Sequence, residues 1–105
     1  MEWNVVYAQS VSGKVWVRDF VNALPIPVRV RVKNALLGLK YDGPYQSPPA
    51  IKKIDAVLYE LRVVGKSQIR VLYTVNGKQI ILLQAFIKKS RKISKKDLLT
   101  AKRRA

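Results

Sequence analysis

The fold of this chain is decided by its second half, where residues 57–86 read VLYELRVVGKSQIRVLYTVNGKQIILLQAF. Three runs rich in β-branched and aromatic residues are typical of strands, and we predict strands at 57–64, 68–75 and 79–86. Gly65-Lys66-Ser67 separates the first two runs, and Asn76-Gly77 separates the last two. Asn-Gly between strands favours a two-residue type I′ turn. The short connections therefore predict a three-stranded antiparallel meander.

The first half of the chain predicts one strand and two helices. Residues 4–8 form a short β-branched run that fits a strand. Apolar residues then recur at helical spacing within 17–24 and again within 28–39, with Pro25 and Pro27 between the two segments. Proline ends the first helix and is accepted in the first turn of the second, so we expect two antiparallel helices joined by a proline corner. Residues 41–50 are rich in proline and are predicted as a loop.

The last predicted element is a basic helix at residues 94–104. Ser94 stands at its N-cap and Asp97 follows three residues later, which is a variant of the capping box. The predicted order is strand, helix, helix, three-stranded meander and helix, forming a single α+β domain over residues 1–105. We expect the helices to pack on one face of the sheet, which leaves part of the opposite face open to a ligand.

The composition limits the chemistry that this domain can perform. The 105 residues include 21 Lys plus Arg against 6 Asp plus Glu, for a formal net charge of +15, and they include neither Cys nor His. A disulfide, a Cys/His zinc site, a thiol nucleophile and an imidazole base are thereby excluded. So dense a positive charge is typical of proteins that bind nucleic acid. We recognise no targeting segment and no run long enough to span a membrane, so we expect a cytoplasmic protein.

Four segments of the second half carry a resemblance to a known family. They are Leu58–Arg62, Ile69–Tyr73, Leu82–Ser90 and Ala101–Arg104. In this order and spacing they resemble the phage-derived, HigB-type branch of the RelE/ParE toxin superfamily, and the resemblance extends over nearly the whole chain.

The resemblance implies a small RelE-like fold and a toxin of a type II toxin–antitoxin system that causes growth arrest. Toxins of this kind are mRNA interferases, ribosome-dependent endoribonucleases that cut mRNA in the ribosomal A site. The scissile phosphate is transferred to the adjacent ribose 2′-hydroxyl without a metal or another cofactor. The implied partners are mRNA, the ribosome and a cognate antitoxin, which in this branch is often a helix-turn-helix protein.

Arg70 is the first candidate for a catalytic role. Strand alternation places it opposite the apolar Ile69, Val71 and Tyr73, so we expect it to point into the open face. A guanidinium there could hold a phosphate bidentately and stabilise charge that grows on its oxygens. By the resemblance, it matches the most characteristic catalytic arginine of the family. The alternative is an arginine paired only with Glu60.

Four further residues complete the predicted catalytic set. Arg62 could contact the RNA backbone or position Arg70, or it could form a salt bridge alone. Glu60 could act as a general base if its pKa were raised, or as a counter-ion that orients the arginines. Lys88 and Lys89 end the third meander strand, where the family has basic residues near the scissile phosphate. They could stabilise the leaving group or supply only general attraction.

Other residues are predicted to bind RNA. Phe86 could stack on a base or belong to the core. Gln84 stands where the family commonly has His, and a glutamine hydrogen-bonds but does not take a proton at neutral pH. The basic residues near the last helix could contact ribosomal RNA without sequence preference, namely Arg91, Lys92, Lys95, Lys96, Lys102, Arg103 and Arg104.

Two alternative functions remain open at this point. One is a toxin of the same fold that inhibits gyrase. The other is a catalytically silent RNA-binding module, which the presence of Gln84 in place of the family's His favours. Tyr73 matches a family tyrosine, but its strand position predicts a structural role. Trp3, Tyr7 and Trp16 are predicted to be core residues or antitoxin contacts.

Overall fold

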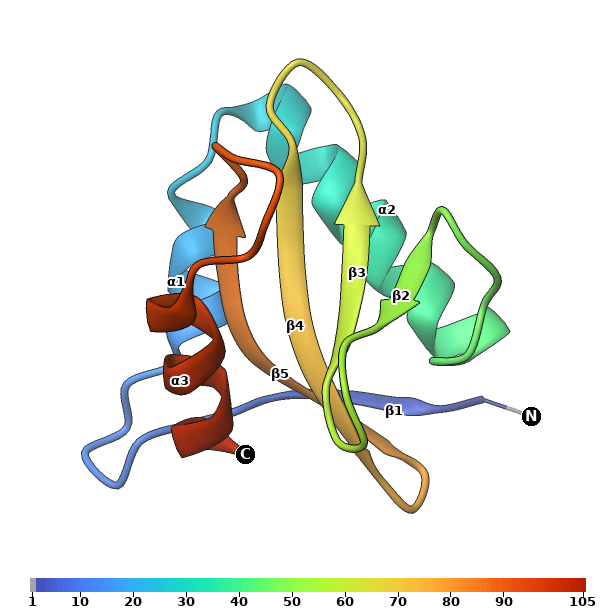
Figure 1. Cartoon of the computed structure of the whole chain (residues 1–105), viewed down its shortest axis with the longest axis vertical. Coiled ribbons are helices and arrows are strands. Elements are labelled where there is room, and N and C mark those ends of the chain that lie inside the picture. The colour runs from blue at the N-terminus through green and yellow to red at the C-terminus, as the bar shows by residue number, and fades with distance from the viewer. Residues whose placement is uncertain (1) are drawn as a thin grey trace.

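The computed structural model describes residues 2–105 and shows a five-stranded mixed sheet with three helices (Figure 1). The elements are β1 (Asn4–Tyr7), α1 (Trp16–Asn22), α2 (Ile26–Asp42), β2 (Ile51–Lys53), β3 (Tyr59–Val63), β4 (Ile69–Asn76), β5 (Gln79–Ile87) and α3 (Lys95–Arg104). The predicted α+β class is confirmed. In the described part of the chain, no helix combines the length and the apolar character that crossing a membrane requires.

The strands lie in the order β1-β5-β4-β3-β2. The β3, β4 and β5 strands form the predicted antiparallel meander, and β1 adds to β5 in parallel. The sequence prediction missed β2, which pairs antiparallel with β3, because three residues are too few for a recognisable pattern. The sheet therefore has β1 at one edge and β2 at the other.

The hairpin between β4 and β5 lies one residue later than predicted. Asn76 pairs with Gln79, so the two turn residues are Gly77 and Lys78 rather than Asn76 and Gly77. Gly77 has a φ of 61°, and among the described residues only glycines have positive φ. A positive φ at the first turn residue alone is typical of a type II′ turn, which requires glycine at that place. The predicted type I′ turn is therefore wrong.

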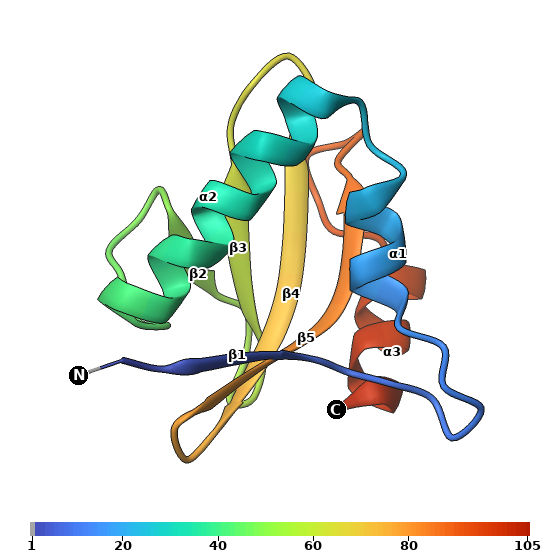
Figure 2. The ribbon, with the colours of Figure 1, turned by 180° about the vertical axis from the view of Figure 1, so that it is seen from behind.

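Helices α1 and α2 cover one face of the sheet (Figure 2). Pro25 is the N-cap of α2 and Pro27 lies in its first turn, so the predicted proline corner is confirmed. Val17 and Val21 of α1 and Val32 and Leu39 of α2 pack against β4 and β5 in the main core. Tyr73 is fully buried there, as predicted.

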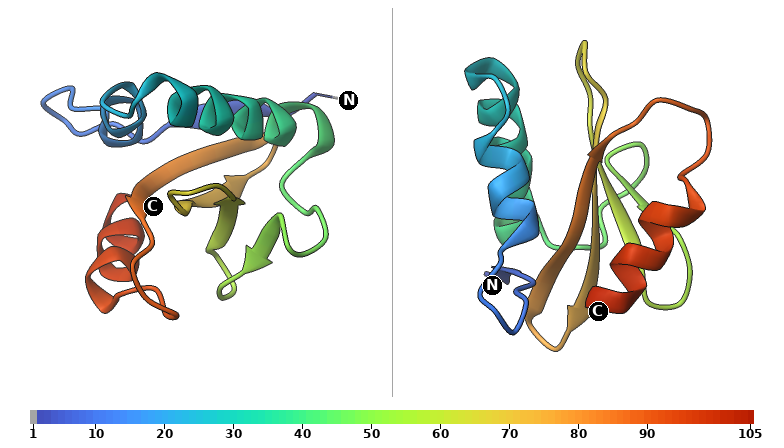
Figure 3. Two further views of the ribbon diagram at one scale, coloured as in Figure 1. Left: turned by 90° about the horizontal axis from the view of Figure 1, so that it is seen from above. Right: turned by 90° about the vertical axis from the view of Figure 1, so that its left-hand side faces the viewer.

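Helix α3 packs against the other face of the sheet (Figure 3). Ala101 of α3 is buried with Leu58, Leu72 and Leu83, which point away from the main core. The prediction that all helices share one face is therefore wrong, because these leucines make the second face apolar as well. The predicted cap is confirmed, since the Ser94 hydroxyl accepts a hydrogen bond from the backbone N–H of Asp97.

Candidate nucleic-acid interface

Three charged side chains meet on the face of the sheet that α3 partly covers. Arg62 of β3 lies directly opposite Arg70 of β4 in the strand register, and Glu60 lies two residues before Arg62. Oε1 of Glu60 is 2.9 Å from Nε of Arg62, and Oε2 is 3.9 Å from Nε of Arg70. The structure thus brings together three of the five predicted catalytic residues as one arginine–glutamate cluster.

The burial of this cluster differs from the sequence prediction. Glu60 is 1 % exposed and Arg70 is 7 % exposed, while the side chain of Arg62 keeps 26 % of its surface. Arg70 does point to the predicted face, but the prediction that this face is open is wrong at Arg70. Glu60 is held as a buried counter-ion. Of the three, Arg62 offers the most surface to a ligand.

Arg70 is fixed by several partners. Its Nη1 donates hydrogen bonds of 3.2 Å to Oε1 of Gln68 and to the carbonyl of Ile69. Burial lowers the pKa of the Arg70 guanidinium, and the Glu60 carboxylate opposes that shift. Arginine remains charged at neutral pH even so. Arg70 Nε and Glu60 Oε2 are buried without a hydrogen-bond partner. The cluster therefore has one donor and one acceptor whose hydrogen bonds are not satisfied within the protein.

A lysine-lined hollow of about 200 Å³ lies beside this cluster. Phe86 contributes to its wall and is the cross-strand partner of Arg70. Lys88, Lys89 and Lys92 also line it, so the structure brings four predicted residues to one place. The half-buried ring of Phe86 and three ammonium groups can hold a base and its phosphates there.

Sequence reasoning missed four other residues that line the hollow, namely Ile87, Ser90, Ser94 and Asp97. The sequence identified Ser94 and Asp97 only as the capping pair at the start of α3. That they also line the hollow depends on where α3 packs on the sheet, which the sequence pattern does not show. Oδ2 of Asp97 accepts a 2.8 Å hydrogen bond from the Ser94 hydroxyl. This pair fixes the rim where α3 begins.

Gln84 joins the two ends of α3 to the sheet. Its Nε2 donates to Oδ1 of Asp97 at 3.0 Å, in the first turn of the helix. Its Oε1 accepts from Nη1 of Arg104 at 2.7 Å, in the last turn. Nη1 of Arg104 also donates to the carbonyl of Leu83, and its guanidinium lies 3.9 Å from the ring centroid of Trp16. Gln84 and Arg104 therefore have partners within the protein, and their predicted contact with RNA stays a prediction.

The remaining predicted contacts are distributed around α3. Arg91, Lys95 and Lys96 are exposed and lie on the segment that borders the hollow. Arg103 lies instead beside Trp16 and Thr100, away from the hollow. Lys102 forms an ion pair of 3.1 Å with Asp55. The N-terminal part of α3 and the preceding loop are thus the basic rim of the site.

The acidic side chains that the structure describes do not form a metal site. Within residues 2–105, no group of three or more His, Cys, Asp or Glu side chains is arranged to hold a metal ion. Glu60 is engaged with two arginines, and Asp97 with Gln84 and Ser94. The polar chemistry of the site is carried by guanidinium and ammonium groups.

The fold and this site define a small basic α+β protein with an arginine–glutamate cluster beside a lysine-lined hollow. The chain belongs to the phage-derived Gp49-like family (DUF891), whose family model matches residues 19–105. This family is part of the RelE/HigB-like toxin superfamily and is a toxin-like module, which suggests an antitoxin partner. Among curated proteins, none matches the chain. The superfamily is thereby confirmed, while the specific HigB branch stays a prediction.

Proposed function

We propose that this chain is the toxin of a type II toxin–antitoxin system and acts as a ribosome-dependent, metal-independent endoribonuclease on mRNA in the A site. The observation that carries the proposal is the arginine–glutamate cluster next to the lysine-lined hollow. The buried guanidinium of Arg70 and the ammonium groups of the lysines that line the hollow are suited to a phosphate whose charge increases during reaction. The family, which is toxin-like, supports the same reading.

In the proposed reaction, the ribose 2′-oxygen attacks the adjacent phosphorus and the P–O5′ bond breaks. The 2′-hydroxyl loses its proton, and the leaving 5′-oxygen gains one. Arg70 supplies a fixed positive charge behind the phosphate, and the exposed part of Arg62 contacts its oxygens. Lys88 and Lys89 neutralise the phosphate and the leaving oxygen. Phe86 holds a base by stacking.

Glu60 acts in this proposal as a positioning residue. Its carboxylate is 1 % exposed and is held between two guanidiniums, so a substrate hydroxyl would have to displace Arg62 to reach it. Most of the rate enhancement then comes from orientation of the 2′-hydroxyl and from the electrostatics of the site.

A silent RNA-binding module is the second candidate, and Gln84 favours it. Both polar ends of the Gln84 side chain are engaged by Asp97 and Arg104, so this position supplies no proton acceptor to the hollow. Such a module would bind RNA through the same lysines without cutting it.

The test is a purified translation reaction with a defined mRNA, with and without ribosomes, read by primer extension. Discrete cuts that require ribosomes are expected for the wild type. Arg62→Ala and Lys88→Ala should reduce them by roughly 100-fold, the scale of losing one electrostatic contact to the transition state. Lys33→Ala is the matched control, since it removes an exposed lysine from α2 on the other side of the sheet.

Three outcomes separate the candidates. Cuts that disappear in Arg62→Ala and persist in Lys33→Ala support the nuclease. RNA binding without cuts, lost in Lys88→Ala, supports the silent module. If the folded protein neither cuts nor binds RNA, gyrase inhibition becomes the favoured function, and a DNA supercoiling assay measures it directly.

A further inference from the structure

Helix α2 has a second apolar stripe on the side that faces away from the core. Ile26, Val30, Lys33, Leu37 and Tyr41 follow one another at intervals of three or four residues, so they lie along one side of the helix. The four apolar members are between 50 % and 68 % exposed. Single exposed apolar side chains are ordinary, but a row along four turns of one helix marks an interaction surface.

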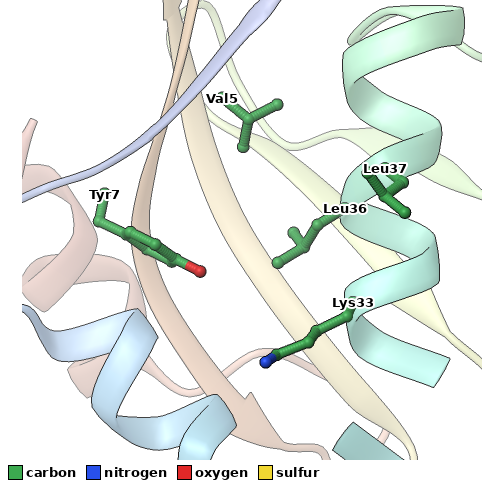
Figure 4. Close-up of a pocket in the computed structure, with 5 residues that line it drawn as sticks. All are labelled: Val5, Tyr7, Lys33, Leu36 and Leu37. Atoms are coloured by element: carbon green, nitrogen blue, oxygen red, sulfur yellow. The ribbon is translucent and has the colours of Figure 1, made fainter. Parts of the chain in front are cut away.

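The stripe continues into a groove between α2 and β1. Figure 4 shows Leu36 and Lys33 extending from α2 towards the side of Val5 and Tyr7 of β1, and Leu37 of α2 also lines this groove. Its volume is about 320 Å³, and apolar atoms make up most of its lining. Leu37 and Lys33 belong to both features, so stripe and groove form one continuous surface, here called the α2–β1 surface. It lies on the opposite side of the sheet from the arginine–glutamate cluster.

Charge selects the kind of partner that this surface fits. Helix α2 carries Arg29, Arg31, Lys33 and Lys40 against a single acid, Asp42. A second copy of the chain would bring another net charge of +15 to the interface, and like charges that face each other oppose association. A partner with apolar side chains flanked by acidic ones complements the surface.

From this surface we infer that the partner is an acidic amphipathic helix of the antitoxin, which lies along α2 and inserts apolar side chains into the groove beside β1. A helix fits because a long, narrow apolar stripe matches the stripe of a second helix packed alongside. The identity of the partner as an antitoxin rests on the proposed function, whereas the apolar stripe and its basic flanks do not.

The test uses the full chain and, as probe, the purified protein encoded by the adjacent gene. Leu37→Lys places a charge in the centre of the surface, and Leu99→Lys makes the same change at a similarly exposed leucine of α3. Because the partner is acidic, the added positive charge alone would strengthen binding in both variants. We expect Leu37→Lys to weaken binding by about tenfold or more, since it removes a central apolar contact. Leu99→Lys should stay within about twofold of the wild type.

Hydrogen exchange of the complex provides a second measurement that needs no variant. Slower exchange in residues 26–42 and 4–7 is expected on binding. Equal affinities of the two variants, protection confined to residues 88–104, or no binding of the wild type would overturn the inference. So would a dimer of the chain alone that Leu37→Lys dissociates, because the occupant would then be a second copy. The proposed nuclease is tested without the partner, so loss of RNA cleavage and loss of this interface are separate results.

Discussion

Glu60→Ala is expected to destabilise the fold strongly, because it leaves two guanidiniums facing each other without their counter-ion. Arg62 and Arg70 are direct cross-strand neighbours, and Glu60 is buried between them. At an effective dielectric constant of about 20, charges at the 3.9 Å separation of Glu60 and Arg70 attract by about 4 kcal/mol. The attraction of Arg62 is screened more, since its side chain is 26 % exposed.

The net loss is smaller than the sum of these attractions, because removing the carboxylate also removes the cost of burying it. Breaking a buried ion pair by deleting one partner typically costs about 3–5 kcal/mol, and we expect about 3 kcal/mol here. Urea unfolding followed by circular dichroism measures it. With a slope of about 1–3 kcal/mol per molar, the midpoint should fall by about 1–3 M.

Two variants make this measurement interpretable. Glu60→Gln keeps the shape of the side chain and an oxygen for the Arg62 hydrogen bond, so its loss should be clearly smaller. Glu2→Ala breaks only a surface ion pair with Lys40 and should cost less than about 1 kcal/mol. A loss below about 1 kcal/mol for Glu60→Ala, equal to that of Glu2→Ala, would refute the reasoning that a carboxylate holds the two arginines together.

Three further outcomes are expected. Gln84→Ala removes two hydrogen bonds that hold α3, so it should cost about 2 kcal/mol and speed hydrogen exchange in α3 but not in α2; unchanged exchange in α3 would contradict that role. Tyr73→Phe leaves the buried carbonyl of Pro44 without its 2.6 Å hydrogen bond and should lower Tm by about 5–10 °C, whereas an unchanged Tm would show that water replaces the bond. Two backbone N–H groups hold the pKa of Asp55 below its usual 3.8, so the ionised carboxylate stabilises the fold above pH 3.8 and this stabilisation is lost as the pH falls through the lowered pKa. Asp55→Asn should therefore flatten the dependence of the unfolding free energy on pH between about pH 5 and 2. A pH dependence equal to that of the wild type would count against this role of Asp55.

The local elements could be predicted from the sequence because each carries its own signal. Periodicity located the helices, the prolines located the corner before α2, and Ser94 located the start of α3. The hairpin was placed within one residue of its position. The difference between turns beginning at Asn76 and at Gly77 depends on the strand register, which packing on both faces of the sheet decides.

The side of the sheet on which α3 packs could not be read from the helix itself, whose apolar residues are few. The better signal lay in the strands. Leu72 alternates with the core residues of β4, and Leu58 and Leu83 lie on the same side as Leu72. A central strand that is apolar on both faces is covered on both faces. That pattern also explains why Arg70, predicted as exposed, is nearly buried.

Only the part of the candidate site that depends on local sequence could be predicted. Residue types and strand ends placed Lys88 and Lys89 near Phe86, and the structure groups them. The positions of Gln84 and Arg104 depend on contacts between α3 and β5, which no local pattern reports. The sequence therefore predicted which polar and charged side chains could contact RNA. The packing of α3 on the sheet decides which of these side chains are already engaged in hydrogen bonds within the protein.

The parallel pairing of β1 with β5 has a consequence for synthesis of the chain. Asn4 pairs with Gln79 and Tyr7 with Leu82, so β1 gains its neighbour only after β2, β3 and β4 have been translated. The edge of the sheet and the α2–β1 surface are therefore incomplete in every nascent chain that ends before β5. Contacts so distant in sequence also slow folding, because a long loop must close before they form. Prematurely terminated chains that lack β5 would leave β1 unpaired. The free N–H and C=O groups of an unpaired strand can pair with other chains, so such products are expected to aggregate or be degraded.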